Sequence, residues 1–520
     1  MEDNLVQIET LVIELLLIVS LVAIGVQYLR VPYTVALVGV GLLIGLAQPL
    51  VAELTGPIQL DLTPELILAL FVPPLIFEAA FNLDVEQLRR NLPAVLLMAV
   101  PGVVVTMFIV GGIVAATTTL ALPVALVFGA LIAATDPVAV VAMFRSLGVP
   151  RRLAVLVEGE SLLNDGTAIV IFNVVLAVAV TGQFSIGQSI MDFVRVVIGG
   201  LVIGLGLGAV IQAIIARVDN HLIETTLTTV LAFGAYLLAE RFHFSGVLAV
   251  VAAGLLNGNL GGQGMSPTTR IILDNFWEYV AFLANSLLFF LIGLELDAAA
   301  LLEHGPSILV AIIAVLIARV LVVYVFSWMV NRSGEPIPMR WQHVLAWGGL
   351  RGAISLALVL SLPTALGGDR AVLTTLTFGV VLFTLFVQGT TIGPLLRWLG
   401  VVNTSELHQE YETSRARLIT LQNSEKHMQG LRQRGAISSY AWERIQPDLH
   451  QETEAATDKL RSLLEDYPEL AELELRTARA EMLRSQRSVL LDLRRNGVIS
   501  EEVFEQMAVS IDELLEDLQA

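Results

Sequence analysis

Long apolar runs separated by short polar linkers dominate the first 400 residues of this chain. A helix needs about 20 mostly apolar residues to cross a bilayer, and each run comes close to that length or exceeds it. The first 400 residues contain thirteen such runs. Because thirteen is odd, we expect the two termini to lie on opposite sides of the membrane. The pattern predicts an all-α membrane protein with spans near residues 8–29, 33–50, 64–80, 92–117, 121–145, 153–181, 187–217, 222–240, 244–259, 271–295, 306–330, 341–362 and 371–399.

Charged side chains become about three times as dense after residue 400. Residues 1–400 carry 41 of them, whereas the much shorter stretch 401–520 carries 37. The whole chain is only 15% charged and has a mean hydropathy of +0.76, below the roughly 25% charge of ordinary soluble domains. We therefore expect a transmembrane domain, residues 1–400, followed by a soluble helical tail, residues 401–520.

The basic residues indicate the orientation. One set of alternate linkers holds eleven arginines and the other holds three, and basic linkers stay on the cytoplasmic side. We therefore expect the N-terminus outside and the tail in the cytoplasm, with the protein in a prokaryotic plasma membrane. The larger set comprises Arg30, Arg89, Arg90, Arg145, Arg151, Arg152, Arg217, Arg270, Arg332, Arg340 and Arg397, and the smaller comprises Arg195, Arg241 and Arg370.

Two of the apolar runs are interrupted. The fifth contains Ala134-Thr-Asp-Pro137, and the twelfth contains Trp347-Gly-Gly-Leu-Arg-Gly352. The two runs are seven apart, an odd offset, so they cross in opposite directions. Paired broken helices are typical of transporters with inverted repeats, whose site lies where the breaks cross. The alternative is that Gly and Pro merely kink two ordinary helices.

Several classes of function lack their sequence features. The chain has no cysteine, which excludes disulfides and thiolate chemistry. It has no GxxxxGK[ST] loop for an ATP-driven pump, and a net charge of −18 does not favour nucleic acid. We expect no cofactor and no enzymatic activity. The acidic start, Met1-Glu-Asp-Asn, predicts that the first apolar run is retained as a helix rather than removed as a signal peptide.

Intramembrane acids are the candidate chemistry, because ionisable groups at membrane depth are costly and therefore functional suspects. Ser161 and Asp165 share one helical face, and Glu160 and Asn164 share the adjacent face. A buried carboxylate beside a second acid holds a proton more readily than one in water, so a cation and a proton are expected to compete for Asp165. Hard cations such as Na⁺ prefer oxygen ligands; the candidate ligands are Asp165, Asp136, Ser161 and the Thr135 carbonyl, with Glu78 contributing through water. The alternative makes the two aspartates helix caps or packing residues.

Two arginines also lie within apolar runs. Arg319 needs a buried anion, and Glu160 is the preferred partner, in a pair that braces the site rather than binding the ion. Arg351, in the second break, is expected to offset exposed backbone carbonyls. The alternative for each is an arginine that extends to the membrane surface.

The tail carries a weak internal repeat. Leu431-Arg-Gln-Arg-Gly-Ala-Ile-Ser438 is echoed by Leu493-Arg-Arg-Asn-Gly-Val-Ile-Ser500, and Trp442 and Phe504 follow at the same offset. Gly suits the end of a helix and Ser the start of the next, so we expect two related helical hairpins. They are interpreted as a regulatory or dimer-associated module of unknown ligand, or alternatively as a merely solvated tail.

Five motifs occur together in one order: Phe71-Val-Pro-Pro-Leu-Ile-Phe-Glu, Ala134-Thr-Asp-Pro-Val, Glu158-Gly-Glu-Ser-Leu-Leu-Asn-Asp, Ile317-Ala-Arg-Val and Gly348-Gly-Leu-Arg-Gly-Ala. Together they resemble the monovalent cation/proton antiporters, and most closely the NhaP-type sodium/proton exchangers. The resemblance covers about 400 residues. It implies a homodimer of thirteen-helix protomers, each with a dimerisation subdomain and a core subdomain, in which Asn164 and Asp165 lie at the ion site.

The resemblance also implies roles for single residues. Asp136 and Ser161 would help bind the cation, and Glu160 would pair with Arg319. An Asn before the essential Asp, as here, is typical of electroneutral members. The expected function is therefore exchange of Na⁺ or Li⁺ for H⁺ by alternating access, in contact with membrane lipid. A K⁺/H⁺ antiporter, a gated cation channel and an ion sensor remain as alternatives.

Overall fold

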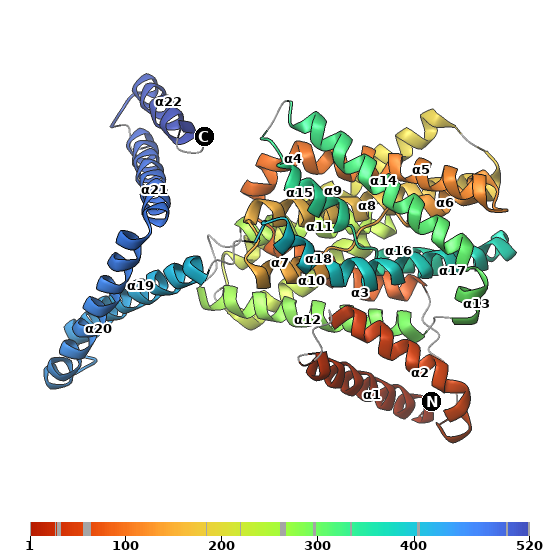
Figure 1. Cartoon of the computed structure of the whole chain (residues 1–520), viewed down its shortest axis with the longest axis horizontal. Helices are drawn as coiled ribbons and strands as arrows, with labels where there is room; N and C mark the ends of the chain where they lie inside the picture. Colours follow the sequence, from red (N-terminus) through yellow and green to blue (C-terminus); the bar gives the residue numbers. More distant parts are fainter. Residues whose placement is uncertain are drawn as a thin grey trace. The chain divides into compact units, whose positions relative to one another are not determined.

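The computed structural model describes residues 2–26, 28, 33–55, 64–183, 185–218, 220–260, 267–294, 298–332, 335–402, 406–495 and 498–517. The chain divides into two compact units, Met1–Val402 and Asn403–Ala520. Within the described residues all regular structure is helical (Figure 1). Arg30, one of the basic residues used for orientation, lies outside them, and the side chain of Arg145 is not described.

The helices of the first unit follow the apolar runs. They are α1 (Glu2–Val26), α2 (Tyr33–Thr55), α3 (Pro64–Asn82), α4 (Val85–Ala99), α5 (Pro101–Thr117), α6 (Leu122–Leu131), α7 (Val138–Leu147), α8 (Arg151–Thr181), α9 (Ile186–Ile215), α10 (His221–Arg241), α11 (Gly246–Leu260), α12 (Pro267–Leu294), α13 (Ala298–Glu303), α14 (Gly305–Val330), α15 (Met339–Trp347), α16 (Ala353–Leu360), α17 (Gly368–Phe383) and α18 (Gly389–Trp398). A short 3-10 turn (Thr364–Leu366) precedes α17, and a π-helical turn (Thr384–Gln388) joins it to α18.

Six helical stretches among the described residues are long and apolar enough to cross a membrane: Val85–Thr117, Arg151–Thr181, Ile186–Ile215, His221–Arg241, Gly305–Val330 and Gly368–Trp398. Shorter apolar helices lie at Ile13–Val26, Tyr33–Ala47, Leu68–Asn82, Leu122–Leu131 and Gly246–Asn259. The stretches differ in their surroundings, because α9 exposes most of its apolar side chains whereas α8 buries residues along most of its length. An exposed apolar helix suits a lipid environment, so the fold indicates a multi-pass membrane protein.

Both predicted interruptions are breaks in the helices. Residues 132–137 separate α6 from α7, and residues 348–352 separate α15 from α16. Pro137 disfavours helical backbone in the residue before it, and glycines at 348, 349 and 352 make the second segment a poor helix. The two breaks contact each other, since the Asp136 amide donates to the Leu350 carbonyl at 2.8 Å.

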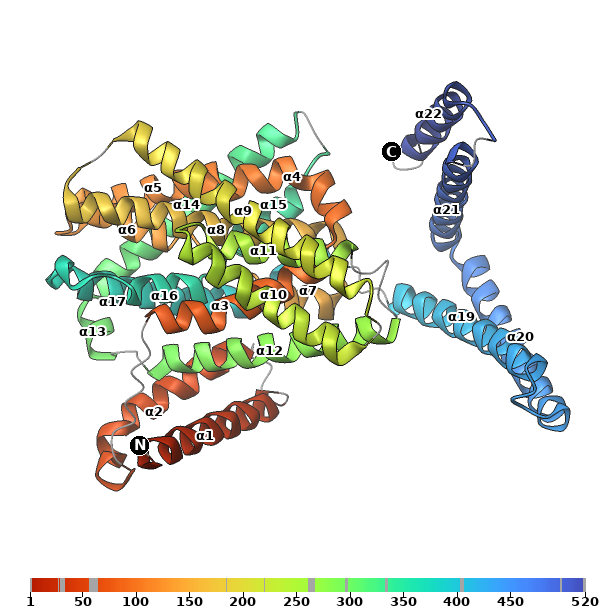
Figure 2. The same cartoon turned by 180° about the vertical axis from the view of Figure 1, so that it is seen from behind.

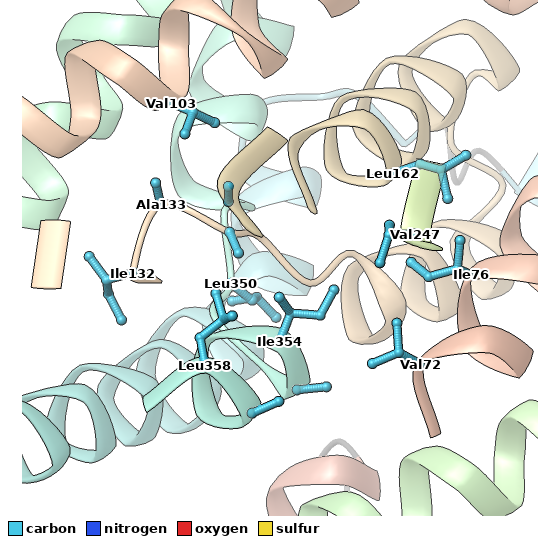
Figure 3. Close-up of a cluster of buried hydrophobic side chains, with 14 of the residues drawn as sticks. Val72, Ile76, Val103, Ile132, Ala133, Leu162, Val247, Leu350, Ile354 and Leu358 are labelled. Carbon is cyan, nitrogen blue, oxygen red and sulfur yellow. The ribbon is translucent and has the colours of Figure 1, made fainter. Parts of the chain in front are cut away.

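Buried apolar side chains form a cluster that includes residues of both breaks (Figure 3). These side chains come from distant parts of the sequence, so that several helices hold the breaks in place. They include Val72 and Ile76 of α3, Leu162 of α8, Val247 of α11, Ile132 and Leu350 of the breaks, and Ile354 and Leu358 of α16. At one edge of this unit, α2 packs between α1 and α12 (Figure 2). Gly41 and Gly293 allow α2 and α12 to approach closely, because a Cβ atom on either would overlap the other helix.

The second unit contains α19 (Glu406–Gln433), α20 (Ser439–Asp466), α21 (Pro468–Arg495) and α22 (Glu501–Asp517). α19 packs on α20, and α21 packs on α22. Gly435, with φ +73°, follows α19, and Ser438 caps α20 by accepting from the Ala441 amide at 3.2 Å. At the second copy of the repeat, Gly497 lies outside the described residues, and the Ser500 hydroxyl accepts from the Val503 amide at 3.4 Å. Trp442 and Phe504 are both buried.

Candidate ion-binding site

The site begins on α8, a helix that starts after Pro150 and runs unbroken for 31 residues. Its middle turns bury Glu160, Ser161, Asn164 and Asp165, each no more than 6% exposed. Four polar side chains at that burial need partners, because an unsatisfied buried polar group costs about 1–3 kcal/mol. The partners separate into two groups on the two faces of the helix.

The first group is the bracing cluster, comprising Glu160, Asn164 and Arg319. Arg319 of α14 binds both carboxylate oxygens of Glu160, Nη1 to Oε1 at 2.7 Å and Nη2 to Oε2 at 3.0 Å. Its Nε donates to the Leu345 carbonyl of α15 at 3.1 Å. The Asn164 amide donates to Glu160 Oε1 at 3.2 Å. A two-point contact between a guanidinium and a carboxylate fixes orientation as well as charge, so α8, α14 and α15 are tied together.

The second group comprises Asp136, Asp165, Thr135 and Ser161. It is called the cation cluster here because these are the residues predicted to bind a cation. Asp136 Oδ1 accepts from the Val138 amide at 3.0 Å, and the carboxylate also accepts from the Ala353 amide. Asp136 therefore lies at the N-terminal ends of both α7 and α16, positions that favour a carboxylate. Within the described residues, the Asp165 carboxylate makes neither a hydrogen bond nor an ion pair.

Thr135 connects the two clusters. Its hydroxyl lies 3.1 Å from the Ser161 hydroxyl and accepts from the Asn164 amide at 3.1 Å. Asn164 also donates to the Ala133 carbonyl at 3.1 Å, in the first break. The position of this break is therefore linked, through Asn164, to the bracing pair on the other face of α8.

Arg351 joins the second break to the first. Its Nη1 donates to the carbonyls of Ala133 and Ala134, at 3.0 and 3.2 Å, and its backbone amide donates to the Thr384 hydroxyl at 3.1 Å. The side chain is 1% exposed. A break leaves helix-end carbonyls without intrahelical partners, and Arg351 satisfies two of them. Ser355 of α16 adds a similar bond to the Leu131 carbonyl at 2.8 Å.

An inner cavity opens onto the carboxylates of the cation cluster. The space between its lining residues that no atom fills is about 560 Å³, part of it open to solvent. Thr135, Asp136, Asp165, Glu158 and Asn285 supply most of its polar lining, and residues of α3 and α16 supply much of its apolar lining. Ser161 is not among the lining residues that the structure describes, and its hydroxyl is paired with that of Thr135, which does line the cavity. The two aspartates are thus the groups best placed to meet an ion.

Glu78 lies outside this inner cavity. It lines a larger outer cavity of about 1300 Å³ together with Glu158, Glu278 and Asn285, and it accepts from the Asn82 amide at 3.0 Å. The two cavities share several lining residues, namely Ala79, Pro137, Val138, Glu158 and Asn285. A third cavity also includes Glu158, beside Asp84 and Arg151. Glu158 therefore lies at the junction of all three.

Sequence reasoning missed several residues at this site. Asn285, Thr34, Ser355 and Thr384 were not selected, although each is a polar residue within an apolar run. A polar residue within an apolar run is an unspecific signal. Many hydroxyls of the membrane unit donate hydrogen bonds to a carbonyl of their own helix, as Thr377 does to the Leu373 carbonyl. Gly352 was noted only as a helix breaker. In the structure a Cβ atom there would overlap the Asp136 carboxylate.

The fold and site define a class: a multi-pass helical membrane protein with buried acids where two broken helices cross. Residues 15–398 match the model of the family described as sodium/hydrogen exchanger, transmembrane. The chain belongs to this family, which is one of transporters rather than enzymes.

Two relatives and one solved structure resemble the chain over different extents. The Na(+)/H(+) antiporter ApNhaP of Aphanothece halophytica is 38% identical over 502 residues, covering 94% of each chain. The Na(+)/H(+) antiporter NhaH of Halobacillus dabanensis is 38% identical over 392 residues, covering 74% of this chain and 96% of NhaH. The sodium proton antiporter MjNhaP1 of Methanocaldococcus jannaschii shares the fold, with a TM-score of 0.62 at 24% identity over 76% of this chain and 100% of that one.

Proposed function

We propose that the protein exchanges Na⁺ or Li⁺ for H⁺ across the membrane, with the cation and the proton competing for Asp165. The observation that carries the proposal is the contrast between two acids on α8. Glu160 is bound on both oxygens by Arg319, whereas Asp165 lines a cavity without a hydrogen bond or ion pair among the described residues. The Asp165 carboxylate is therefore available to a cation or to a proton, whereas that of Glu160 is not. The relatives named as Na(+)/H(+) antiporters support the choice of ions.

The charges at the crossing favour a one-for-one exchange. The two clusters and Arg351 together contain three acids (Asp136, Glu160 and Asp165) and two arginines (Arg319 and Arg351), so this group carries one net negative charge when all are ionised. Glu158 is counted separately, because it lies at the junction of the three cavities. Either one Na⁺ or one proton neutralises the group. Buried charge is costly when uncompensated, so the site binds one or the other, and exchange is electroneutral. Asn164 matters here, because an acid at that position would add a second titrating group.

We assign the remaining roles as follows. Asp165 and Asp136 bind the cation, with Ser161 and the Thr135 carbonyl as supporting oxygen ligands and Glu78 contributing through water. Glu160, Arg319, Asn164 and Arg351 hold the backbone of the breaks in place. The thirteen apolar runs act as spans in two inverted repeats, and movement of the core carries the site from one side to the other, as expected for crossing broken helices.

We further propose that two copies associate in a plasma membrane, with the N-terminus outside and residues 401–520 in the cytoplasm as a regulatory tail. NhaH is matched over 96% of its own length and over 74% of this chain. An antiporter of that length supports the view that about a quarter of this chain is not needed for exchange.

The test is ion-driven proton movement in proteoliposomes, measured with Na⁺, Li⁺ and K⁺ side by side and at several imposed membrane potentials. We expect Na⁺ and Li⁺ to drive proton movement at a rate that does not change with potential. A K⁺ response equal to the Na⁺ response would favour the K⁺/H⁺ alternative. A current without coupled proton movement would indicate a channel and contradict the proposal.

A further inference from the structure

The outer cavity has the features of a second cation position. It is bounded by residues of α2, α3, α7, α8 and α12, and it shares five lining residues with the inner cavity. Any ion that enters from this side therefore reaches the outer cavity before it meets Asp136 and Asp165.

The charge of the lining is of one sign. Glu78, Glu158 and Glu278 line the outer cavity, and no Arg or Lys occurs among the lining residues that the structure describes. Acids around a low-dielectric cavity raise the local concentration of cations. Attraction alone does not make a binding position, which needs oxygen atoms directed at the ion.

Two lining residues carry candidate oxygens. Asn285 of α12 is 7% exposed and Thr34 of α2 is 5% exposed, and both line the cavity. Asn285 Oδ1 and Thr34 Oγ1 are buried and have no hydrogen-bond partner among the described residues. Leaving a buried polar atom without a partner costs about 1–3 kcal/mol. Unlike Asn257, whose Oδ1 also lacks a partner in the described structure, these two residues line a cavity from which an ion could supply one.

The backbone around these oxygens is held firmly. The Tyr33 hydroxyl lies 2.9 Å from the Ser286 hydroxyl, and the Tyr33 ring stacks on Phe282 with centroids 5.3 Å apart. Tyr33 precedes Thr34 in the chain, Ser286 follows Asn285, and Phe282 lies one helical turn before Asn285. The start of α2 is thereby fixed against α12 at the level of the two oxygens, and a fixed frame is what a selective ligand set requires.

We propose that Asn285 and Thr34 are neutral oxygen ligands of a transient Na⁺ position in the outer cavity, next to the Glu78 and Glu158 carboxylates. Carbonyl, hydroxyl and carboxylate oxygens are the ligands that hard cations prefer. Asn285 lines both cavities, so it contacts the ion as the ion passes from this position to Asp165. This inference rests on the proposed antiport function and adds two ligands to it.

The test compares Na⁺-driven proton movement in proteoliposomes containing the full chain. Asn285→Ala and Thr34→Val each remove one oxygen ligand. We expect each to raise the Na⁺ concentration for half-maximal exchange roughly three- to tenfold, the value of about one hydrogen bond. The loss of exchange should be largest at limiting Na⁺, because Asp165 and Asp136 are untouched. Asn285→Asp keeps an oxygen and adds charge, so it should restore or lower the half-maximal concentration.

Matched controls separate this role from packing. Asn257→Ala removes another buried amide whose Oδ1 also lacks a partner, and Thr377→Val removes another buried hydroxyl. Neither residue lines either cavity. Both controls should keep the wild-type half-maximal concentration.

Three outcomes overturn the inference while leaving antiport in place: unchanged Na⁺ dependence in Asn285→Ala and Thr34→Val, an equal shift in the controls, or a weaker response in Asn285→Asp than in Asn285→Ala. If Asn285→Ala fails to fold, Asn285→Asp and Thr34→Val decide the matter. A wild-type protein without Na⁺-driven proton movement would instead contradict the proposed function itself.

Discussion

The bracing cluster and the cation cluster lie on one stretch of α8, yet their acids are treated in opposite ways. Glu160 is 1% exposed and receives two bonds from Arg319 and one from Asn164. Asp165, five residues later, lines a cavity and has no hydrogen bond or ion pair within the described structure. The comparison shows that one helix carries a carboxylate paired on both oxygens and another that no described side chain pairs. In the proposed mechanism the paired acid provides the frame, and the unpaired acid exchanges ions.

Asp165→Asn should have the largest effect, because it removes the carboxylate for which both ions compete. We expect Na⁺-driven proton movement to fall to the leak of empty vesicles, while thermal unfolding and elution volume stay unchanged. Asp192→Asn is the control, an exposed acid at the start of α9. If Asp165→Asn retained exchange, Asp165 would not be the acid for which the two ions compete.

Gly352→Ala should disturb the cation cluster without changing any charge. The added Cβ would overlap the Asp136 carboxylate, and a shift of about 1 Å at such a site can cost roughly 100-fold in rate. We expect exchange at limiting Na⁺ to fall roughly ten- to 100-fold. The matched variant is Gly206→Ala on α9, where a Cβ meets no atom within 4 Å. Equal activity of the two variants would show that the position of Asp136 is unimportant.

Breaking the bracing pair should act first on stability. Glu160→Gln or Arg319→Gln leaves one buried charge unpaired, at a cost of about 3–5 kcal/mol in unfolding free energy. The double variant should lose less than the sum of the two, as measured by thermal unfolding in detergent. The exposed pair Arg90–Glu86, at 2.7 Å, serves as the control and should matter by only a few tenths of a kcal/mol. Additive losses at Glu160 and Arg319 would argue against their coupling.

Removing residues 403–520 should have the smallest effect, because both clusters lie in the first unit. We expect the maximal exchange rate to persist, and any change to appear in its dependence on pH. A pH profile identical to that of the full chain would argue against a regulatory tail. Complete loss of exchange in a correctly folded protein would show that the tail is required for transport.

The sequence predicted the fold class well because its signals were local. Apolar run length indicates helices, and Gly or Pro within a run indicates where a helix breaks, as at Pro137 and Gly352. The acids stood out at once against an apolar background. The sequence could not distinguish the shorter helices, such as α6 and α7, from two halves of one span with only a kink. It also did not indicate the π-helical turn at Thr384–Gln388. In this turn the Thr384 hydroxyl accepts a hydrogen bond from the Arg351 backbone amide.

The remaining features of the site depend on contacts between distant segments. Glu160 and Arg319 are 159 residues apart. Their pairing was predicted because a buried arginine needs an anion, and helical periodicity alone would not have indicated it. Ser161 shares a helical face with Asp165, but the sequence did not indicate that its hydroxyl pairs with that of Thr135. Asn285 and Thr34 could be identified only from a cavity that three other helices, α3, α7 and α8, also line. Periodicity specifies a face of a helix, whereas tertiary packing decides what that face meets.

The most direct test of the central claim is proton release when Na⁺ is added to the purified protein in weakly buffered detergent solution. If the cation and the proton compete for one carboxylate, wild-type protein should release protons in proportion to the Na⁺ bound, and less so as the pH rises and Asp165 is already deprotonated. Asp165→Asn should release none. Sodium binding without proton release, or release that persists in Asp165→Asn, would contradict the account.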